Sequence, residues 1–237
     1  MFKMKNKKKK ALAMMQRKLL TNVHKTSIIS EQFRTIRTNL KFALPNLSCK
    51  TILVTSSIPG EGKTTNAANI AIVFAQEGKK VLLVDADMRR PAIHYTFELL
   101  NISGLSSVLI QSDKLNEAIQ ETYIEGLFVL TSGPIPPNPV ELLASEMMDT
   151  LIEKMIAYYD VIIFDTPPVN SVTDAQILAN KTDGVLLIVN TGVVEKSSVV
   201  KAKNSLLVAQ AKILGVVMNN YALPKEQYKS QYYHTRK

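Results

Sequence analysis

The chain has 237 residues, a length that suits one α/β domain with a sizeable core, and its single cysteine, Cys49, excludes a disulfide framework and fits a reducing compartment. Hydrophobic residues make up 46% and charged residues 21%, which is typical of globular proteins, and no apolar run approaches the roughly 18 residues that a membrane span requires. The formal net charge of +9 resides in residues 1–30, which hold nine basic side chains and no acidic one, so the rest of the chain is neutral.

The first element in chain order is a basic arm, residues 1–29, with the lysine-rich run KNKKKK at residues 5–10. Such a run suits anionic lipid, at about 1 kcal/mol per basic residue near the surface. It also suits nucleic acid or an acidic partner, and charge blocks of this kind are often simply solvated and disordered. The residues leave these alternatives open.

Residues 30–42 predict an amphipathic helix ahead of the first strand. Three apolar and three basic side chains define its two faces: Phe33, Ile36 and Leu40 on one, Arg34, Arg37 and Lys41 on the other. Glu31, Arg34 and Arg37 are spaced by three, so one helix face offers both charge signs to a neighbouring subunit. The alternative is an exposed helix with weak ion pairs, worth at most about 1 kcal/mol.

Six short runs rich in Val, Ile and Leu predict strands that are covered on both faces: residues 51–55, 81–87, 127–132, 161–165, 184–190 and 213–220. Helical patterns lie at residues 67–78, 140–159 and 195–212, and the first of these stops at Gly78. Strand, helix and strand at this spacing indicate βαβ units. The predicted fold class is therefore α/β, with a mostly parallel central sheet and helices on both faces, and the loop motif described next makes it a single P-loop NTPase-like domain.

A phosphate-binding loop is predicted after the first strand, at SSIPGEGKTT, residues 56–65. The glycines let backbone N–H groups turn inward, and the following helix N-terminus adds donors and its positive dipole end. Lys63 then reaches the β- and γ-phosphates of ATP, and the Thr64 hydroxyl binds Mg²⁺. The predicted nucleotide-binding residues of the loop are Ser57, Pro59, Gly60, Glu61, Gly62, Lys63, Thr64 and Thr65. Ser57 replaces the usual first glycine, which is tolerable if its φ is negative.

Carboxylates follow two further predicted strands: Asp85 and Asp87 end VLLVDAD, and Asp165 ends VIIFD. Ligands of an open parallel sheet bind beyond the carboxyl ends of its strands, so all three carboxylates should face the same crevice as Lys63. An apolar strand that ends in Asp fits a site where the carboxylate orients Mg²⁺ or its water. One such strand end is a weak signal, but the group together predicts an ATP-Mg²⁺ site.

The last 17 residues lack glycine and apolar periodicity, yet they hold four of the eight tyrosines: Tyr221, Tyr228, Tyr232 and Tyr233. Together with the motifs above, this tail resembles the bacterial protein-tyrosine kinases, P-loop kinases that regulate capsule and exopolysaccharide synthesis. SSIPGEGKTT, VLLVDADMRRP and VIIFDTPP look like that family's Walker A, A′ and B motifs, and EQFRTIR is similar to its Glu-x-x-Arg-x-x-Arg oligomerisation motif. The resemblance divides the chain into an arm (1–29), a kinase domain (30–220) and a tyrosine-rich tail (221–237).

The resemblance implies roles for the site residues. Lys63 holds the phosphates, and Thr64, Asp87 and Asp165 place the metal. Asp85 accepts the proton of the tyrosine hydroxyl, whose ordinary pKa is about 10, or it serves only the metal. The catalytic residues expected in this way are Lys63, Asp85 and Asp87. One more nucleotide contact is implied: Asn219 matches the position where related ATPases contact adenine, with a turn residue as the alternative.

The resemblance also implies partners. Glu31, Arg34 and Arg37 would build a homo-oligomeric ring in which one subunit's tail enters the crevice of the next and is autophosphorylated there. A separate transmembrane activator would recruit the cytoplasmic kinase to the inner face of the plasma membrane. Protein substrates of the expected kind are a sugar-nucleotide dehydrogenase or a glycosyltransferase, and a phosphotyrosine phosphatase would reverse the reaction. Nucleic acid is not expected as a partner.

Two other functions compete with a kinase. Partition ATPases of the ParA/MinD type carry a lysine just after the first glycine of the loop, where this chain has Ile58. The tyrosine-rich tail is a second argument against a partition ATPase. A scaffold that binds nucleotide to control assembly would bind ATP and form no phosphotyrosine.

Overall fold

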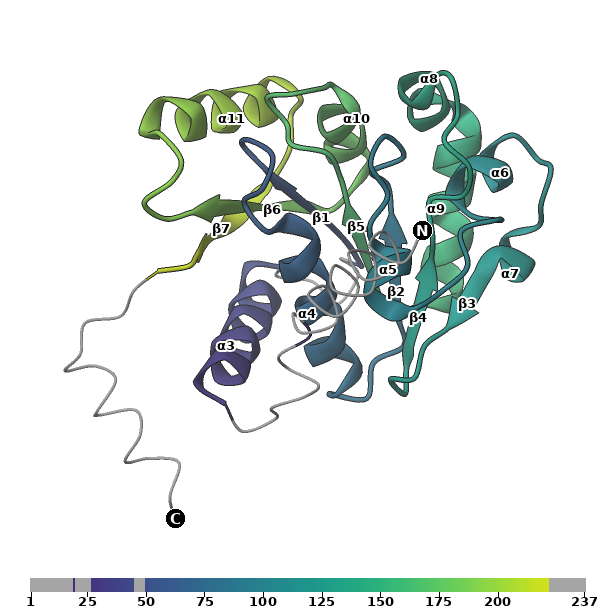
Figure 1. Cartoon of the computed structure of the whole chain (residues 1–237), viewed down its shortest axis with the longest axis horizontal. Helices are drawn as coiled ribbons and strands as arrows, with labels where there is room; N and C mark the ends of the chain where they lie inside the picture. Colours follow the sequence, from purple (N-terminus) through teal and green to yellow (C-terminus); the bar gives the residue numbers. More distant parts are fainter. Residues whose placement is uncertain (1–18, 20–26, 45–49, 222–237) are drawn as a thin grey trace, which may run out of the picture.

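One sheet of seven strands organises the part of the chain that the structure describes, which is residues 19, 27–44 and 50–221 of this computed structural model (Figure 1). The strands in chain order are β1 (Thr51–Ser56), β2 (Val81–Asp85), β3 (Ile119–Glu121), β4 (Leu127–Leu130), β5 (Val161–Asp165), β6 (Gly184–Asn190) and β7 (Ile213–Asn219). Their spatial order is β3-β4-β2-β5-β1-β6-β7, and only β3 pairs in the antiparallel sense. The predicted mostly parallel sheet is confirmed, and β3 is an addition that the sequence analysis missed.

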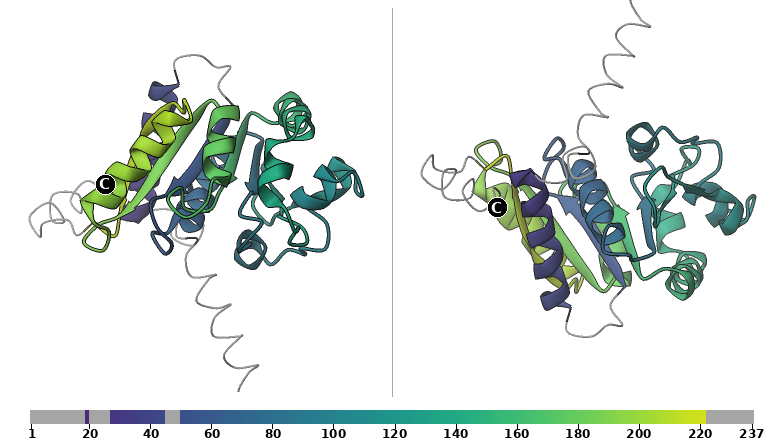
Figure 2. Two further views of the ribbon diagram at one scale, coloured as in Figure 1. Left: turned by 90° about the horizontal axis from the view of Figure 1, so that it is seen from above. Right: turned by 90° about the horizontal axis from the view of Figure 1, so that it is seen from below.

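Helices cover both faces of this sheet, as predicted. In the view from below, α3 (Ile28–Ala43) and α4 (Lys63–Ala75) lie in front of the strands, and in the view from above α10 (Asp174–Lys181) and α11 (Lys196–Val208) do so (Figure 2). The side of α10 and α11 also carries α8 (Pro139–Ala144) and α9 (Glu146–Tyr158). The segment between β2 and β3 holds three short helices: α5 (Ile93–Phe97), α6 (Leu105–Leu109) and α7 (Leu115–Ala118).

Two hydrophobic cores, one on each face, explain why the central strands are apolar without alternation. Successive side chains of a strand point to opposite faces. In β1, Leu53 therefore packs in the core beneath α9, α10 and α11, whereas Ile52 and Val54 pack beneath α3 and α4, and all are 1% exposed or less. Phe33 and Leu40 of α3 join the second core, which confirms the predicted apolar face of that helix.

Some predicted boundaries are wrong, for local reasons. The helix predicted over residues 140–159 is broken at Ser145, whose backbone is extended and whose hydroxyl accepts the Met148 N–H, so Ser145 begins a second helix as its N-cap. The strand predicted over residues 81–87 ends at Asp85, because the Asp85 carboxylate binds backbone N–H groups of residues 92 and 93 and turns the chain.

The prediction that residues 213–220 form a strand covered on both faces is also wrong. The strand exists, but β7 is an edge strand, with Val216 53% and Met218 56% exposed. Its apolar composition alone could not distinguish a central strand from an edge strand.

The predicted arm and tail fall mainly outside the described residues. Of residues 1–29 the structure describes only Leu19 and residues 27–29, and of the tail it describes only Tyr221. The lysine run and Tyr228, Tyr232 and Tyr233 therefore lie outside it. A search of the described helices finds none that combines the length and the apolar character needed to cross a membrane.

Candidate active site

The predicted phosphate loop connects β1 to α4 at the carboxyl end of the sheet. Gly60 and Gly62 have φ of 87° and 90°, a conformation that residues with a Cβ rarely adopt, so both glycines are required by the turn. The helix begins at Lys63, four residues before the predicted start at residue 67. Lys63, Thr64 and Thr65 thus occupy its first turn, where backbone N–H groups lack helical partners and can bind an anion.

Ser57 and Glu61 brace the loop from inside. The φ of Ser57 is not positive, so the condition set for replacing the usual glycine is met. Its hydroxyl donates to Glu61 Oε2 over 2.6 Å, and the Ile58 N–H donates to the same oxygen over 2.8 Å. Glu61 is 1% exposed, and its Oε1 accepts the Asn190 N–H over 2.9 Å. The Glu61 carboxylate is therefore used within the protein, and its backbone is what remains for a phosphate.

Three carboxylates converge on the lysine of the loop. The register of β2 and β5 places Asp85 directly beside Asp165, and β1 lies on the other side of β5. Lys63 Nζ lies 2.9 Å from Asp87 Oδ2 and 3.6 Å from Asp165 Oδ1. The structure thus brings together Lys63, Asp85, Asp87 and Asp165 in one cluster at the carboxyl end of the sheet, where parallel α/β sheets bind their ligands.

The balance of burial and neighbouring charge raises the pKa of Asp85, Asp165 and Lys63. Burial, and after it the charge of the neighbouring Asp165, raise the pKa of Asp85 to about 7, against the hydrogen bonds from residues 92 and 93. Burial also raises the pKa of Asp165, with Lys63 opposing it. The pKa of Lys63 would be lowered by burial, but Asp165 and Asp87 outweigh this effect and raise it. One cation therefore faces an excess of negative charge.

The donor set fits a magnesium ion. Both carboxylate oxygens of Asp165 are buried, and neither has a hydrogen-bond partner among the described residues. A buried carboxylate that accepts no hydrogen bond is costly even with the Lys63 ammonium 3.6 Å away, and a cation would relieve that cost. Carboxylates of Asp87 and Asp165 and the hydroxyl of Thr64, which lies 3.4 Å from Lys63 Nζ, are the hard oxygen ligands that Mg²⁺ prefers.

Three charged side chains, those of Asp85, Arg89 and Asp174, hold the turn after β2. Asp85 Oδ2 accepts the Ala92 and Ile93 N–H groups, each over 3.0 Å, while Oδ1 has a longer contact of 3.3 Å with the Asp87 N–H. Arg89 forms a two-pronged ion pair with Asp174 of α10, at 3.0 and 3.1 Å, and Asp174 is 0% exposed. The sequence analysis missed this pair, because an acidic residue in a helix's first turn is common.

The remaining predicted residues lie at the border of this cluster or away from it. Asn219 ends β7, and its Nδ2 donates to the Glu61 carbonyl oxygen over 2.8 Å, so the structure brings it to the loop. Tyr221 follows and is 52% exposed. The predicted oligomerisation motif lies on α3: Arg34 pairs with Glu31, and Arg37 Nη1 donates to the Val73 carbonyl of α4 over 2.7 Å. Arg37 is therefore engaged within its own subunit.

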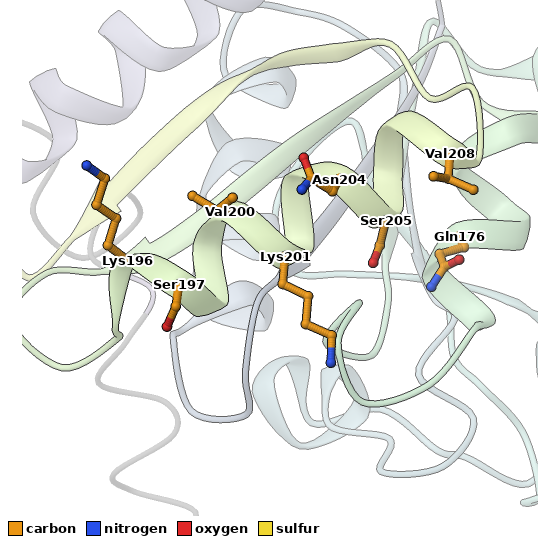
Figure 3. Close-up of a pocket in the computed structure, with 8 residues that line it drawn as sticks. All are labelled: Gln176, Lys196, Ser197, Val200, Lys201, Asn204, Ser205 and Val208. Carbon is orange, nitrogen blue, oxygen red and sulfur yellow. The ribbon is translucent and has the colours of Figure 1, made fainter.

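A separate pocket lies against the outer surface of α11 (Figure 3). It has a volume of about 700 Å³ and is lined by Gln176, Lys196, Ser197, Val200, Lys201, Asn204, Ser205 and Val208. None of its lining residues is acidic or belongs to the phosphate loop. The loop and its carboxylates therefore form the better candidate for chemistry.

Comparisons with known proteins find matches over more than half of the chain. The family described as "AAA domain" matches residues 49–196. The tyrosine-protein kinase YwqD of Bacillus subtilis is 50% identical over 211 residues, 89% of each chain, and the putative tyrosine-protein kinase CapB of Staphylococcus aureus is 44% identical over 88% of this chain and 90% of its own. The crystal structure of the chimerical protein CapA2B2 superposes with a TM-score of 0.84 at 45% identity, covering 87% of this chain and 91% of that one.

Proposed function

This chain belongs to the bacterial tyrosine-protein kinases, and from that premise we propose that it transfers the γ-phosphate of ATP to tyrosines in the tail of a second copy and to tyrosines of other proteins. The observation that carries the proposal is the convergence of Asp85, Asp87 and Asp165 on Lys63 at the end of a phosphate loop. The Ile58 of the loop and the tyrosines of the tail favour a kinase over a partition ATPase.

Nucleotide binding rests on the loop and on the start of α4. Backbone N–H groups from Ser57 to Thr65 bind the phosphates, apart from Pro59, which has none, and Ile58, whose N–H donates to Glu61. Lys63 neutralises the β- and γ-phosphates, and Asn219 lies at the adenine side. Mg²⁺ held by Thr64, Asp87 and Asp165 supplies charge stabilisation for the transferring phosphoryl group. Before ATP arrives, Lys63 is bound to Asp87 and Asp165, so the lysine must exchange these partners for phosphate oxygens.

Asp85 accepts the proton of the attacking tyrosine hydroxyl. Its raised pKa of about 7 is close to the working pH of a general base, and its Oδ1 has only the longer 3.3 Å contact to occupy it. As the O–H bond breaks, the tyrosine oxygen forms a bond to the γ-phosphorus, and the bond from that phosphorus to the β,γ-bridging oxygen breaks to release ADP. Asp85 then carries the proton.

The tail serves as acceptor in trans. Tyr221 lies two residues after the end of β7 and is exposed. The other tyrosines of residues 221–237 follow it in the sequence. Each phosphate adds about −1.5 to −2 charges, so phosphorylation of several tyrosines repels the tail from a site that already holds three carboxylates. Tail release would then loosen a ring built through Glu31, Arg34 and Arg37.

Phosphate mapping tests this function. Incubated with ATP and Mg²⁺ in the presence of a fragment of the transmembrane activator, the protein should acquire phosphotyrosine on Tyr221, Tyr228, Tyr232 and Tyr233, detected by mass spectrometry. Replacing these four tyrosines by phenylalanine should remove the signal, while replacing the exposed domain residue Tyr158 by phenylalanine should leave it intact. ATP binding without any phosphotyrosine would instead identify a nucleotide-controlled scaffold and overturn the proposal.

The oligomer has its own test. A chain carrying Arg34→Ala and Arg37→Ala should lose the ring and run as a monomer in light scattering, since the positive charges of the α3 motif are gone. Because Arg37 also binds the Val73 carbonyl, the matched control is Lys41→Ala, which removes a neighbouring basic residue of α3 paired with Glu77. A ring that persists in the double variant excludes this motif as the subunit contact.

The proposed reaction also implies an activator, protein substrates and a phosphatase. A transmembrane activator places the kinase domain at the inner face of the plasma membrane, and enzymes of polysaccharide precursor synthesis, such as a sugar-nucleotide dehydrogenase or a glycosyltransferase, are its further substrates. A phosphotyrosine phosphatase resets the tail. In this way the kinase regulates capsule or exopolysaccharide synthesis, as the chain's resemblance to CapB and YwqD supports.

A further inference from the structure

Side chains that the proposed phosphoryl transfer does not use fasten the phosphate loop to the ends of the last two parallel strands. Glu61 stands at the centre of this arrangement. Its Oε2 accepts the Ser57 hydroxyl and the Ile58 N–H from within the loop, and its Oε1 accepts the Asn190 N–H at the end of β6. A buried carboxylate is costly unless donors surround it, so these three donors hold Glu61, and with it the loop, in one place.

The second attachment comes from β7. Asn219 Nδ2 donates to the Glu61 carbonyl oxygen over 2.8 Å, and the contact is close enough that a Cβ on Gly62 would lie 2.4 Å from that nitrogen. The two strand ends are tied to each other as well: the Thr191 N–H donates to the Asn219 carbonyl over 2.9 Å, and Asn220 Nδ2 donates to Asn190 Oδ1 over 3.0 Å. The loop and the ends of β6 and β7 therefore form one hydrogen-bonded unit.

This unit lies where the tail begins, at residues 219–221, a segment that we call the root of the tail. Asn219 is the last residue of β7, Asn220 turns the chain with a φ of 55°, and Tyr221 begins the tyrosine-rich segment. The first proposed phosphate acceptor is thus two residues from the amide that holds the phosphate loop.

We propose that Glu61, Asn190 and Asn219 form a latch, a positioning device that keeps the loop in its phosphate-binding shape and couples it to the root of the tail. The proposal rests on the proposed binding of ATP at this loop. The latch acts through the loop backbone. Loss of the latch therefore weakens the binding of any phosphate ligand, whether or not that ligand carries a nucleobase. Coupling is reciprocal: a nucleotide that stabilises the loop also stabilises the strand ends from which the tail departs.

A substitution of Asn219 separates this role from an adenine contact. In the full chain, Asn219→Ala should weaken binding of Mg²⁺-ADP and of Mg²⁺-pyrophosphate, which has no base, by the same factor, roughly three- to tenfold for one lost hydrogen bond. The matched control is Asn180→Ala, because Asn180 Nδ2 likewise donates to a backbone carbonyl, that of Ala209, over 3.1 Å, with no contact to the loop. The control should bind both ligands as the wild type does.

Weaker binding of ADP with unchanged pyrophosphate binding would assign Asn219 to adenine and overturn the latch. Unchanged binding of both ligands would overturn it too. A wild-type chain that bound neither ligand would instead remove the proposed function itself, so the two failures are distinguishable.

Amide hydrogen exchange tests the latch without any catalytic readout. In the nucleotide-free protein, Glu61→Gln should speed exchange at the Ile58 and Asn190 amides, because the glutamine amide offers one oxygen where the carboxylate offered two. Addition of Mg²⁺-ADP should slow exchange of the Thr191 amide, which is bonded to the Asn219 carbonyl, in the wild type and much less in Glu61→Gln. Equal slowing in both proteins would show that the loop and the tail root are not coupled through Glu61.

Discussion

Replacing Lys63 by methionine is expected to lower the rate of tail phosphorylation by about 100- to 1000-fold, the usual cost of removing one preorganised donor from developing charge. Lys63 is the cation that faces Asp85, Asp87 and Asp165, and methionine is likewise unbranched but lacks the terminal ammonium and its charge. The measurement is the initial rate of phosphotyrosine formation at saturating ATP and Mg²⁺, with the wild-type and variant proteins at equal concentration.

Loss of the buried ammonium also leaves carboxylates unpaired, which lowers stability, so folding must be separated from catalysis. Lys63→Arg serves that purpose, because it keeps the positive charge beside Asp87 and Asp165 while its planar guanidinium changes the geometry offered to phosphate. We expect a near-normal melting temperature and a strongly reduced rate. Lys114→Met, on an exposed lysine paired with Glu117, should behave as the wild type does. A Lys63→Met protein that is folded and active would contradict the assigned role.

The order of apolar runs was enough to predict the sheet, because a parallel strand with both faces covered needs Val, Ile and Leu on both sides. Leu53 and its neighbours Ile52 and Val54 serve two different cores, and no alternation could appear in such a run. The predictions that were wrong concern features that depend on tertiary or side-chain contacts. The exposure of Val216 depends on β7 having no neighbour on one side within the described chain, and the break at Ser145 depends on a single side-chain cap.

The residues of the candidate site could be predicted from the sequence to a similar extent. Lys63, Thr64 and the carboxylates could be placed together because strand ends share an edge of the sheet. The internal partners of the loop could not. Nothing in the sequence joins Glu61 to Asn190, which lies 129 positions away, or Arg89 to Asp174, which lies 85 positions away. Such pairs arise only when the folded backbone brings a donor and an acceptor to hydrogen-bonding distance, and this is where function-supporting residues were missed.

The charge balance of the cluster leads to the second large expected effect. Asp165→Asn should abolish phosphotyrosine formation, because it removes a proposed ligand of Mg²⁺, and yet raise the melting temperature of the nucleotide-free protein. Each kcal/mol gained shifts the melting temperature by roughly 2–4 °C for a chain of this size. The gain arises because burial and the charge of Asp87 oppose ionisation of Asp165, against the attraction of Lys63, and because the charge of Asp165 opposes ionisation of Asp85; asparagine removes both costs. Mg²⁺-ADP should raise the melting temperature of the wild type and leave the variant nearly unchanged.

The dependence on pH sharpens this expectation. The pKa of Asp85 is about 7 in the folded chain and near its ordinary value of 3.8 in the unfolded chain, so the folded state binds the additional proton between these values. Stability of the nucleotide-free wild type should therefore fall as pH rises through this window, and the fall should be smaller in Asp165→Asn, which lacks the charge that helps to raise the pKa of Asp85. Asp183→Asn is the contrasting control: Asp183 Oδ2 accepts two backbone N–H groups and the Thr51 hydroxyl at 2.7–2.8 Å, so its loss of charge should lower the melting temperature. A lower melting temperature for Asp165→Asn would mean that Asp165 supports the fold rather than a metal. A buried carboxylate that serves to bind a cation lowers the stability of the protein until the cation binds.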